Sequence, residues 1–151
     1  SATDIIGIHD YDANTEHLRQ RYGPEIKTEQ LFDRRRPGGR VLTLDGYPHR
    51  GQPIMLTEFG GIALARASSP AAPHTWGYST AKDSDEFAVL FERLVEAVVH
   101  TALFSGFCYT QFADTFQEAN GLLRADRTPK IPLARIAKAT TASRTYIPGA
   151  A

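Results

Sequence analysis

The chain has 151 residues, 42% of them hydrophobic and 10% aromatic, which is enough for one globular domain with a core. Its 17 basic residues balance its 17 acidic ones, so we expect neither a nucleic-acid partner nor an anionic membrane surface. The single cysteine, Cys108, excludes an intramolecular disulfide framework and a cysteine-rich zinc site, and no apolar run reaches the roughly 18 residues of a membrane span. No charged signal-peptide pattern opens the chain, and its localisation is left open.

Three short apolar runs predict buried strands. They cover residues 5–8, 54–56 and 104–109. Because the runs are nearly continuous and not alternating, they are typical of parallel strands that are covered on both faces. Each run ends in polar residues, so we expect the chemistry of the protein to gather at one edge of the sheet.

Other segments have apolar residues at helical spacing. The longest covers residues 85–103, with Ser84 as its expected cap, and shorter ones cover residues 16–22 and 132–138. Strands that alternate with helices form right-handed βαβ units. The predicted fold class is therefore α/β with a parallel sheet.

Two stretches do not fit this alternation. Residues 23–53 are expected to be irregular, with one helical turn around residues 28–34 and a candidate hairpin piece at residues 40–46. Residues 60–84 are expected to form a long loop. Long loops in compact domains are typical of functional or disordered segments, and the lone tryptophan, Trp76, favours an ordered one.

Glu58 is the centre of the candidate site, because it lies at the C-terminal end of a predicted buried strand and is followed by Gly60 and Gly61. The two glycines let the chain turn away, so that a ligand reaches the carboxylate. From spacing alone, a glutamate that caps the loop or pairs with an arginine is an equal alternative. Tyr11 ends the first run, and its phenol is placed to hydrogen-bond Glu58 and keep it ionised, unless it is an ordinary boundary tyrosine.

The neighbouring polar residues fit a substrate contact or a structural role better than a metal site. His9 and Asp10 precede Tyr11, and the histidines of the chain show no zinc-binding spacing. Cys108 lies inside the third run and is expected to be a buried, inert thiol and not a nucleophile. The chain contains no nucleotide-binding loop and no acyl-transfer elbow, which disfavours those reaction classes.

Several segments together resemble the end of the catalytic barrel of family 2 glycoside hydrolases, which include β-galactosidases, β-glucuronidases and β-mannosidases. These segments are His9-Asp10-Tyr11, residues 54–61, residues 106–114, Asn120-Gly121-Leu122-Leu123 and Asp126-Arg127-Thr128-Pro129-Lys130. The resemblance covers nearly the whole chain and implies a partial (β/α)8 TIM barrel, with the three runs as strands six to eight. A complete barrel needs about 250 residues. We therefore expect residues 1–151 to be the C-terminal fragment of such a barrel domain.

The resemblance also implies roles for single residues. The Thr-Glu-Phe-Gly motif matches the one that carries the catalytic nucleophile, which gives this role to Glu58, and Tyr11 matches the tyrosine that hydrogen-bonds and orients it. The parent enzyme is then expected to hydrolyse a β-glycoside with retention and to need neither a metal nor an organic cofactor. Further expected substrate contacts are His9, Asp10, Trp76, Gln111 and Asp114.

The chain departs from the family in several places. Thr110 stands where many members have a tryptophan, and Glu118-Ala119-Asn120-Gly121 stands where glucuronidases have the Asn-Lys pair that recognises a uronic acid. Glucuronidase activity is therefore disfavoured, and the identity of the sugar is left open. The family's acid/base glutamate follows an asparagine, and the chain contains no Asn-Glu dipeptide.

The fragment alone is therefore expected to be inactive and to associate, most simply as a homodimer, while the remainder of the barrel is its partner in the parent enzyme. The alternative is a non-catalytic carbohydrate-binding or interaction protein on a partial barrel, in which Trp76, Tyr11 and Gln111 contact a ligand and Glu58 is incidental. In either case Trp76 is expected to offer an apolar face to a sugar ring, unless it pins the loop to the core.

Overall fold

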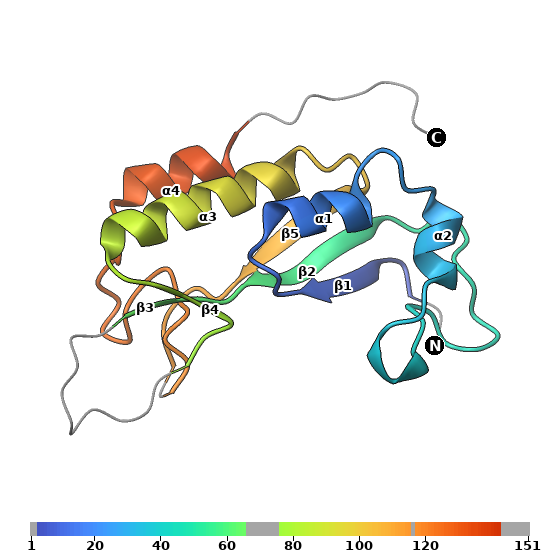
Figure 1. The fold of residues 1–151 in the computed structure, drawn as a ribbon, viewed down its shortest axis with the longest axis horizontal. Helices are drawn as coiled ribbons and strands as arrows, with labels where there is room; N and C mark the ends of the chain where they lie inside the picture. Colours follow the sequence, from blue (N-terminus) through green and yellow to red (C-terminus); the bar gives the residue numbers. More distant parts are fainter. Residues whose placement is uncertain (1–2, 66–75, 116, 143–151) are drawn as a thin grey trace.

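The computed structural model describes residues 3–65, 76–115 and 117–142. In this part of the chain the strands are β1 (Ile6–Asp10), β2 (Ile54–Gly60), β3 (Ile62–Leu64), β4 (Ser79–Ala81) and β5 (Phe104–Thr110). The helices are α1 (Thr15–Tyr22), α2 (Thr28–Asp33), α3 (Ser84–Val99) and α4 (Leu133–Thr140), with a 3-10 turn at Pro37–Gly39. Figure 1 shows α1, α3 and α4 together on one side of the strands.

The central feature is a parallel sheet with the strand order β1-β2-β5. Its register places Ile8 beside Leu56 and Leu56 beside Phe107. Ile8 and Leu56 are fully buried, because α1 and α3 cover this face. The three predicted strands and the α/β class are confirmed.

The opposite face of the sheet is open, so the prediction of strands covered on both faces is wrong for this chain. Gly7 and His9 of β1 are exposed and alternate with buried residues, and Cys108 of β5 is an exposed thiol and not a buried one. An apolar run identifies a strand, but the number of layers that pack on it is decided by other segments. The sheet thus presents one face to the helices and one to solvent.

Helix α3 supplies much of the core. Its N-cap is Asp83, whose Oδ1 accepts a hydrogen bond from the N–H of Glu86 at 2.8 Å, so the predicted helix is confirmed with its cap one residue before Ser84. The predicted helix at residues 16–22 is α1, and its N-cap is Asn14. The side chains of α3 that are at most 1% exposed are Phe87, Ala88, Phe91, Leu94, Val95 and Val98.

Two expectations about the irregular stretches are wrong. No strand forms at residues 40–46, where a hairpin piece was predicted. Within the predicted loop, β3 and β4 pair in parallel with Ile62 beside Ser79, while residues 66–75 lie outside the described part. Strands of three residues leave no periodic pattern in a sequence, so only their pairing reveals them.

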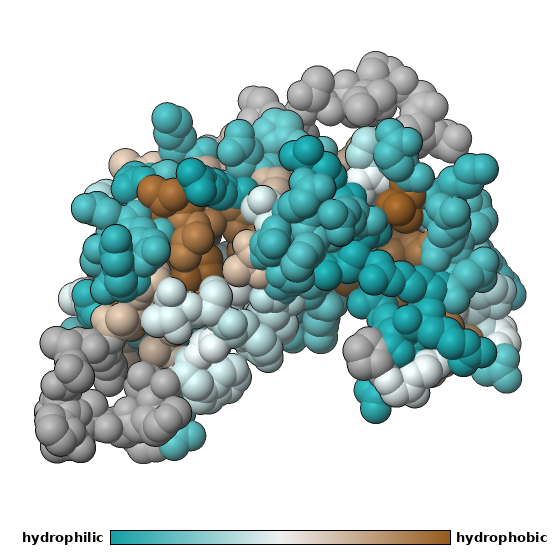
Figure 2. All heavy atoms as spheres, in the orientation of Figure 1, coloured by the Kyte–Doolittle hydropathy of each residue, from teal (hydrophilic) through white to brown (hydrophobic). Residues whose placement is uncertain are grey.

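The face drawn in Figure 2 is largely hydrophilic, and hydrophobic atoms come to the surface beside α3. Val89 of α3 is 39% exposed and Leu133 of α4 is 60% exposed. Among the described helices, none has both the length and the apolar character needed to cross a bilayer. Helix α3 is amphipathic, because its buried apolar residues alternate with exposed ones at helical spacing, and α4 packs on α3.

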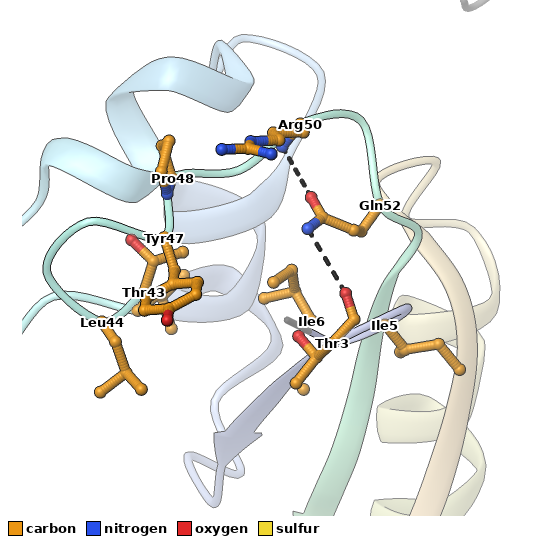
Figure 3. A pocket seen from close by; sticks show the side chains of 11 residues that line it. Thr3, Ile5, Ile6, Thr43, Leu44, Tyr47, Pro48, Arg50 and Gln52 are labelled. Atoms are coloured by element: carbon orange, nitrogen blue, oxygen red, sulfur yellow. Dashed lines mark hydrogen bonds between the residues drawn. The ribbon is translucent and has the colours of Figure 1, made fainter. Parts of the chain in front are cut away.

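A hollow of about 250 Å³ lies at the N-terminal end of β1. The lining residues drawn in Figure 3 include Thr3, Ile5, Ile6, Leu44 and Tyr47. The Gln52 side chain closes one wall, because it accepts from the N–H of Arg50 at 2.6 Å and donates to the carbonyl of Thr3 at 3.4 Å. This hollow contains none of the predicted site residues, which lie at the other end of the strand.

Candidate active site

The C-terminal ends of β1 and β2 bring Tyr11 and Glu58 together. In the register of the sheet, His9 lies beside Glu58, and Gly60 lies beside Thr110 of β5. Tyr11 follows β1 directly, so the phenol reaches across to the neighbouring strand. The predicted meeting of Tyr11 and Glu58 at one rim of the sheet is confirmed.

Two side chains lie beside the Glu58 carboxylate. The hydroxyl of Tyr11 donates a hydrogen bond to Oε2 of Glu58 at 2.8 Å, and Nδ1 of His9 lies 3.2 Å from the same oxygen. The side chain of Glu58 is 41% exposed and that of His9 is 59% exposed, so both face the open side of the sheet. A carboxylate that is oriented by neighbours and still accessible is suited to act as a nucleophile or a base.

The protonation state of Tyr11 fits its role as a donor. Burial and the hydrogen bond to Glu58 raise the pKa of Tyr11 to about 12, while a hydrogen bond with the Thr110 side chain acts in the opposite direction. A free phenol titrates near 10. Tyr11 is therefore protonated at neutral pH, and its hydroxyl donates the hydrogen bond that Glu58 accepts.

Two further aromatic residues extend the site. The ring of Tyr78 is stacked on Tyr11 with 3.9 Å between the centroids and 9° between the planes. The indole of Trp76 meets Tyr78 edge-on at 5.6 Å, and the two residues are 41% and 55% exposed. The structure thus brings Trp76 to the site through Tyr78. Tyr78 is not among the predicted site residues, because nothing in its local pattern distinguishes it from other loop residues.

Asp10 is turned away from Glu58. Its Oδ2 accepts a hydrogen bond from the hydroxyl of Tyr22 at 2.7 Å and lies 2.9 Å from Nε of Arg21, both on α1. The side chain of Asp10 is only 11% exposed. This carboxylate fastens α1 to the end of β1, so it supports the rim from the helical side.

Asp114 is buried in an ion pair. Its Oδ1 accepts from Nζ of Lys130 at 2.7 Å and from the N–H of Gly121 at 2.8 Å. The two charged side chains are 5% and 1% exposed, and Lys130 also donates to the carbonyl of Ala119 at 2.7 Å. These bonds tie together the segments that follow β5. The lysine of the Asp-Arg-Thr-Pro-Lys segment is thus an anchor of the rim.

Gln111 follows β5, and its backbone is bound to the same segments. Its N–H donates to the carbonyl of Asn120 at 3.4 Å, and its carbonyl accepts from the N–H of Leu122 at 3.0 Å. Nε2 of its side chain is buried without a hydrogen-bond partner among the described residues. In the same part of the chain, no three His, Cys, Asp or Glu side chains are grouped to hold a metal ion.

The fold of this chain is similar to that of several solved glycoside hydrolases. No protein-family model and no curated protein matches the sequence. Among solved structures, a GH2 β-galacturonidase from Eisenbergiella tayi matches 97% of this chain and 25% of its own, with a TM-score of 0.60 and 15% identity. A β-glucuronidase from Faecalibacterium prausnitzii matches 96% of this chain and 23% of its own, with a TM-score of 0.54 and 18% identity. The agarase AgWH50C matches 91% of this chain and 18% of its own, with a TM-score of 0.54 and 18% identity.

These neighbours are glycoside hydrolases, and the likeness extends over nearly the whole chain. The resemblance inferred from the sequence motifs is thereby confirmed at the level of the fold. The chain spans about a quarter of the length of the galacturonidase that it matches.

Proposed function

We propose that this chain carries the nucleophile of a retaining β-glycosidase, as the C-terminal part of the catalytic barrel of a longer enzyme. In this proposal β1, β2 and β5 are strands six, seven and eight of the barrel. The main support for this proposal is the position of Glu58. Its carboxylate accepts a 2.8 Å hydrogen bond from the hydroxyl of Tyr11 at the C-terminal rim of a parallel sheet. Catalytic residues of β/α barrels come from this rim, and the fold of the neighbours supports the same reaction class.

The reaction takes two displacements. A carboxylate oxygen of Glu58 attacks the anomeric carbon, while the bond to the leaving oxygen breaks and a second carboxylic acid, contributed by the rest of the barrel, protonates that oxygen. Water then attacks the same anomeric carbon and gives its proton to the second carboxylate, while the bond from that carbon to the Glu58 oxygen breaks. Two inversions at the same carbon retain its configuration. Tyr11 keeps the carboxylate of Glu58 aimed at the sugar through its hydrogen bond.

The other predicted residues divide into two groups in this proposal. His9, Trp76 and Gln111 contact the sugar, and the partly exposed indole of Trp76 offers an apolar face to its C–H surface. Asp10 and Asp114 do not contact the sugar in this proposal. Their ion pairs with Arg21 and Lys130 hold the elements of the rim in place. The Glu58 carboxylate, oriented by Tyr11 and still accessible, suits nucleophilic attack and supports the enzyme over a protein that only binds carbohydrate.

Covalent labelling tests the role of Glu58. In the full-length protein that contains this chain, 2-deoxy-2-fluoro-β-glycosyl fluorides of several sugar configurations are expected to leave a glycosyl group on Glu58, because they form the ester faster than water cleaves it. Peptide mapping by mass spectrometry identifies the labelled carboxylate. Glu58→Gln is the matched control and takes up no label. Labelling of a different carboxylate, or retaining hydrolysis that persists without Glu58, contradicts the proposal.

The 151-residue chain by itself is expected to form a homodimer. β1 and β5 are the outer strands of the sheet, and such edges pair readily with another chain. Beside the start of β1, Ile5, Leu44 and Tyr47 are 46%, 67% and 51% exposed, so association has apolar surface to bury. Sedimentation at micromolar concentration measures the assembly state, and a stable monomer contradicts this expectation.

The isolated dimer is also expected to be inactive. It holds two copies of Glu58, whereas in this proposal the acid that retention requires about 5 to 5.5 Å away comes from the rest of the barrel. A general acid alone contributes roughly 10² to 10⁴ in rate. Turnover of an activated aryl β-glycoside that depends on Glu58 in the isolated chain would show that the barrel is not needed.

A further inference from the structure

Tyr11 lies just outside the strand that carries it, so the backbone of β1 does not fix its ring. The strand ends at Asp10, and Tyr11 begins the connection to α1. Its phenol nevertheless has to point across to Glu58 to make the 2.8 Å hydrogen bond. The ring therefore needs support from another element, and the nearly parallel ring of Tyr78 lies against it.

Tyr78 is itself held by its backbone. Its N–H donates to the carbonyl of Gly61 at 2.8 Å, and the N–H of Ser79 reaches the same carbonyl at 3.4 Å. The N–H of Gly61 donates in turn to the carbonyl of Thr110 at the end of β5. Gly61 therefore links the turn after β2, the end of β5 and the start of β4. These hydrogen bonds fix the backbone from which the Tyr78 side chain extends.

Gly61 also makes room for the stacked pair. Its φ is +64°, a conformation that favours glycine. A Cβ at this position would lie 2.5 Å from Cδ2 of Tyr78 and 2.9 Å from Cδ1 of Tyr11. Both rings occupy the space that any larger residue would take. The glycine that follows the Thr-Glu-Phe-Gly motif thus serves the two tyrosines together.

We propose that Tyr78 is a positioning residue for the nucleophile: stacked on Tyr11, it holds the phenol in the direction in which it donates to Glu58. The inference rests on the proposed function and adds to it a residue from a segment that is distant in the sequence. Tyr78 stacks on Tyr11, and Tyr11 in turn donates to Glu58, so the effect of Tyr78 on the carboxylate passes through Tyr11. Its 55% exposure leaves room for truncation without opening the core.

The rate at which a 2-fluoroglycosyl fluoride inactivates the full-length protein measures the attack by Glu58 directly. Tyr78→Leu is expected to lower the limiting inactivation rate by roughly threefold to tenfold, the factor that corresponds to an aromatic pair, with little change in the inactivator's binding constant. Tyr78→Phe keeps the ring and is expected to rescue the rate. Tyr47→Leu is the matched control, because Tyr47 is 51% exposed and lies at the other end of β1, and it leaves the rate unchanged.

The double variant separates positioning from a direct substrate contact. In a Tyr11→Phe background, Tyr78→Leu is expected to have no further effect, since the hydroxyl that it orients is gone. A loss of equal size in both backgrounds, a change confined to the binding constant, or a Tyr78→Phe variant as slow as Tyr78→Leu overturns the proposal. Tyr78→Thr gives the same comparison if the leucine variant does not fold.

Failure of this inference is distinct from failure of the proposed function. If Glu58 in the unmodified protein takes up no label from any of the inactivators, the proposed function is contradicted and the role of Tyr78 with it. If Glu58 is labelled and the Tyr78 variants react at the unmodified rate, only the role of Tyr78 is contradicted.

Discussion

Replacing Glu58 with alanine in the full-length protein is expected to lower kcat for an activated aryl β-glycoside by roughly 10⁴-fold or more, because no nucleophile remains to form the glycosyl ester. The dinitrophenyl glycosides are suitable substrates, since their leaving group needs no protonation. Initial rates measure the loss. A decrease of less than tenfold would mean that the Glu58 carboxylate is incidental to the reaction.

Azide distinguishes a nucleophile from an acid. In the Glu58→Ala variant the anion enters the space left by the carboxylate, attacks the anomeric carbon and displaces the aryloxide in a single inversion. The expected product is therefore the α-glycosyl azide, identified by its proton NMR coupling. Glu58→Gln leaves less space and serves as the control, with weaker rescue. A β-glycosyl azide would assign Glu58 to proton transfer and contradict its role as nucleophile.

The second large effect is expected on stability. Lys130→Met is expected to lower the free energy of unfolding by about 3 to 5 kcal/mol, because it leaves the Asp114 carboxylate buried without its cation. The two side chains are 1% and 5% exposed and 2.7 Å apart. Urea denaturation of the chain measures the change. In the double variant Lys130→Met/Asp114→Leu, much of the loss is expected to be recovered, since no charge remains buried.

A second ion pair in the same chain is the matched control. Arg135 of α4 donates two hydrogen bonds to the Glu92 carboxylate of α3, at 2.6 and 2.7 Å. The side chains are 36% and 37% exposed, so water screens their charges. Arg135→Gln is therefore expected to destabilise the chain far less than Lys130→Met. Equal losses in the free energy of unfolding would show that burial of the Asp114–Lys130 pair does not determine its contribution to stability.

The local pattern of the sequence was sufficient for the elements that carry the site. Apolar runs predicted β1, β2 and β5, and helical spacing predicted α1, α3 and α4. A strand or helix that buries one side has apolar residues at regular intervals along the sequence, so its pattern is visible locally. The positions of Tyr11 and Glu58 followed from these strands. In a parallel sheet the C-terminal ends of neighbouring strands meet at one rim, so residues that end two strands come together without further information.

Only the tertiary structure decided what each polar side chain at the rim does. Asp10 and Asp114 share that edge with Glu58, yet their carboxylates are taken by Tyr22 and by Lys130 while Glu58 remains open. The tertiary structure also decided that one face of the sheet is exposed to solvent. The physical reason is that burial and pairing depend on which segments meet in space, and the spacing of residues along one strand does not record this.

The same reason explains why Tyr78 is visible only in three dimensions. The ring centroids of Tyr78 and Tyr11 lie 3.9 Å apart, although α1, α2, β2 and β3 separate the two residues along the chain. The contact exists because β3 and β4 pair and because Gly61 leaves space. A sequence determines such a contact only through the fold as a whole, since no local propensity favours it.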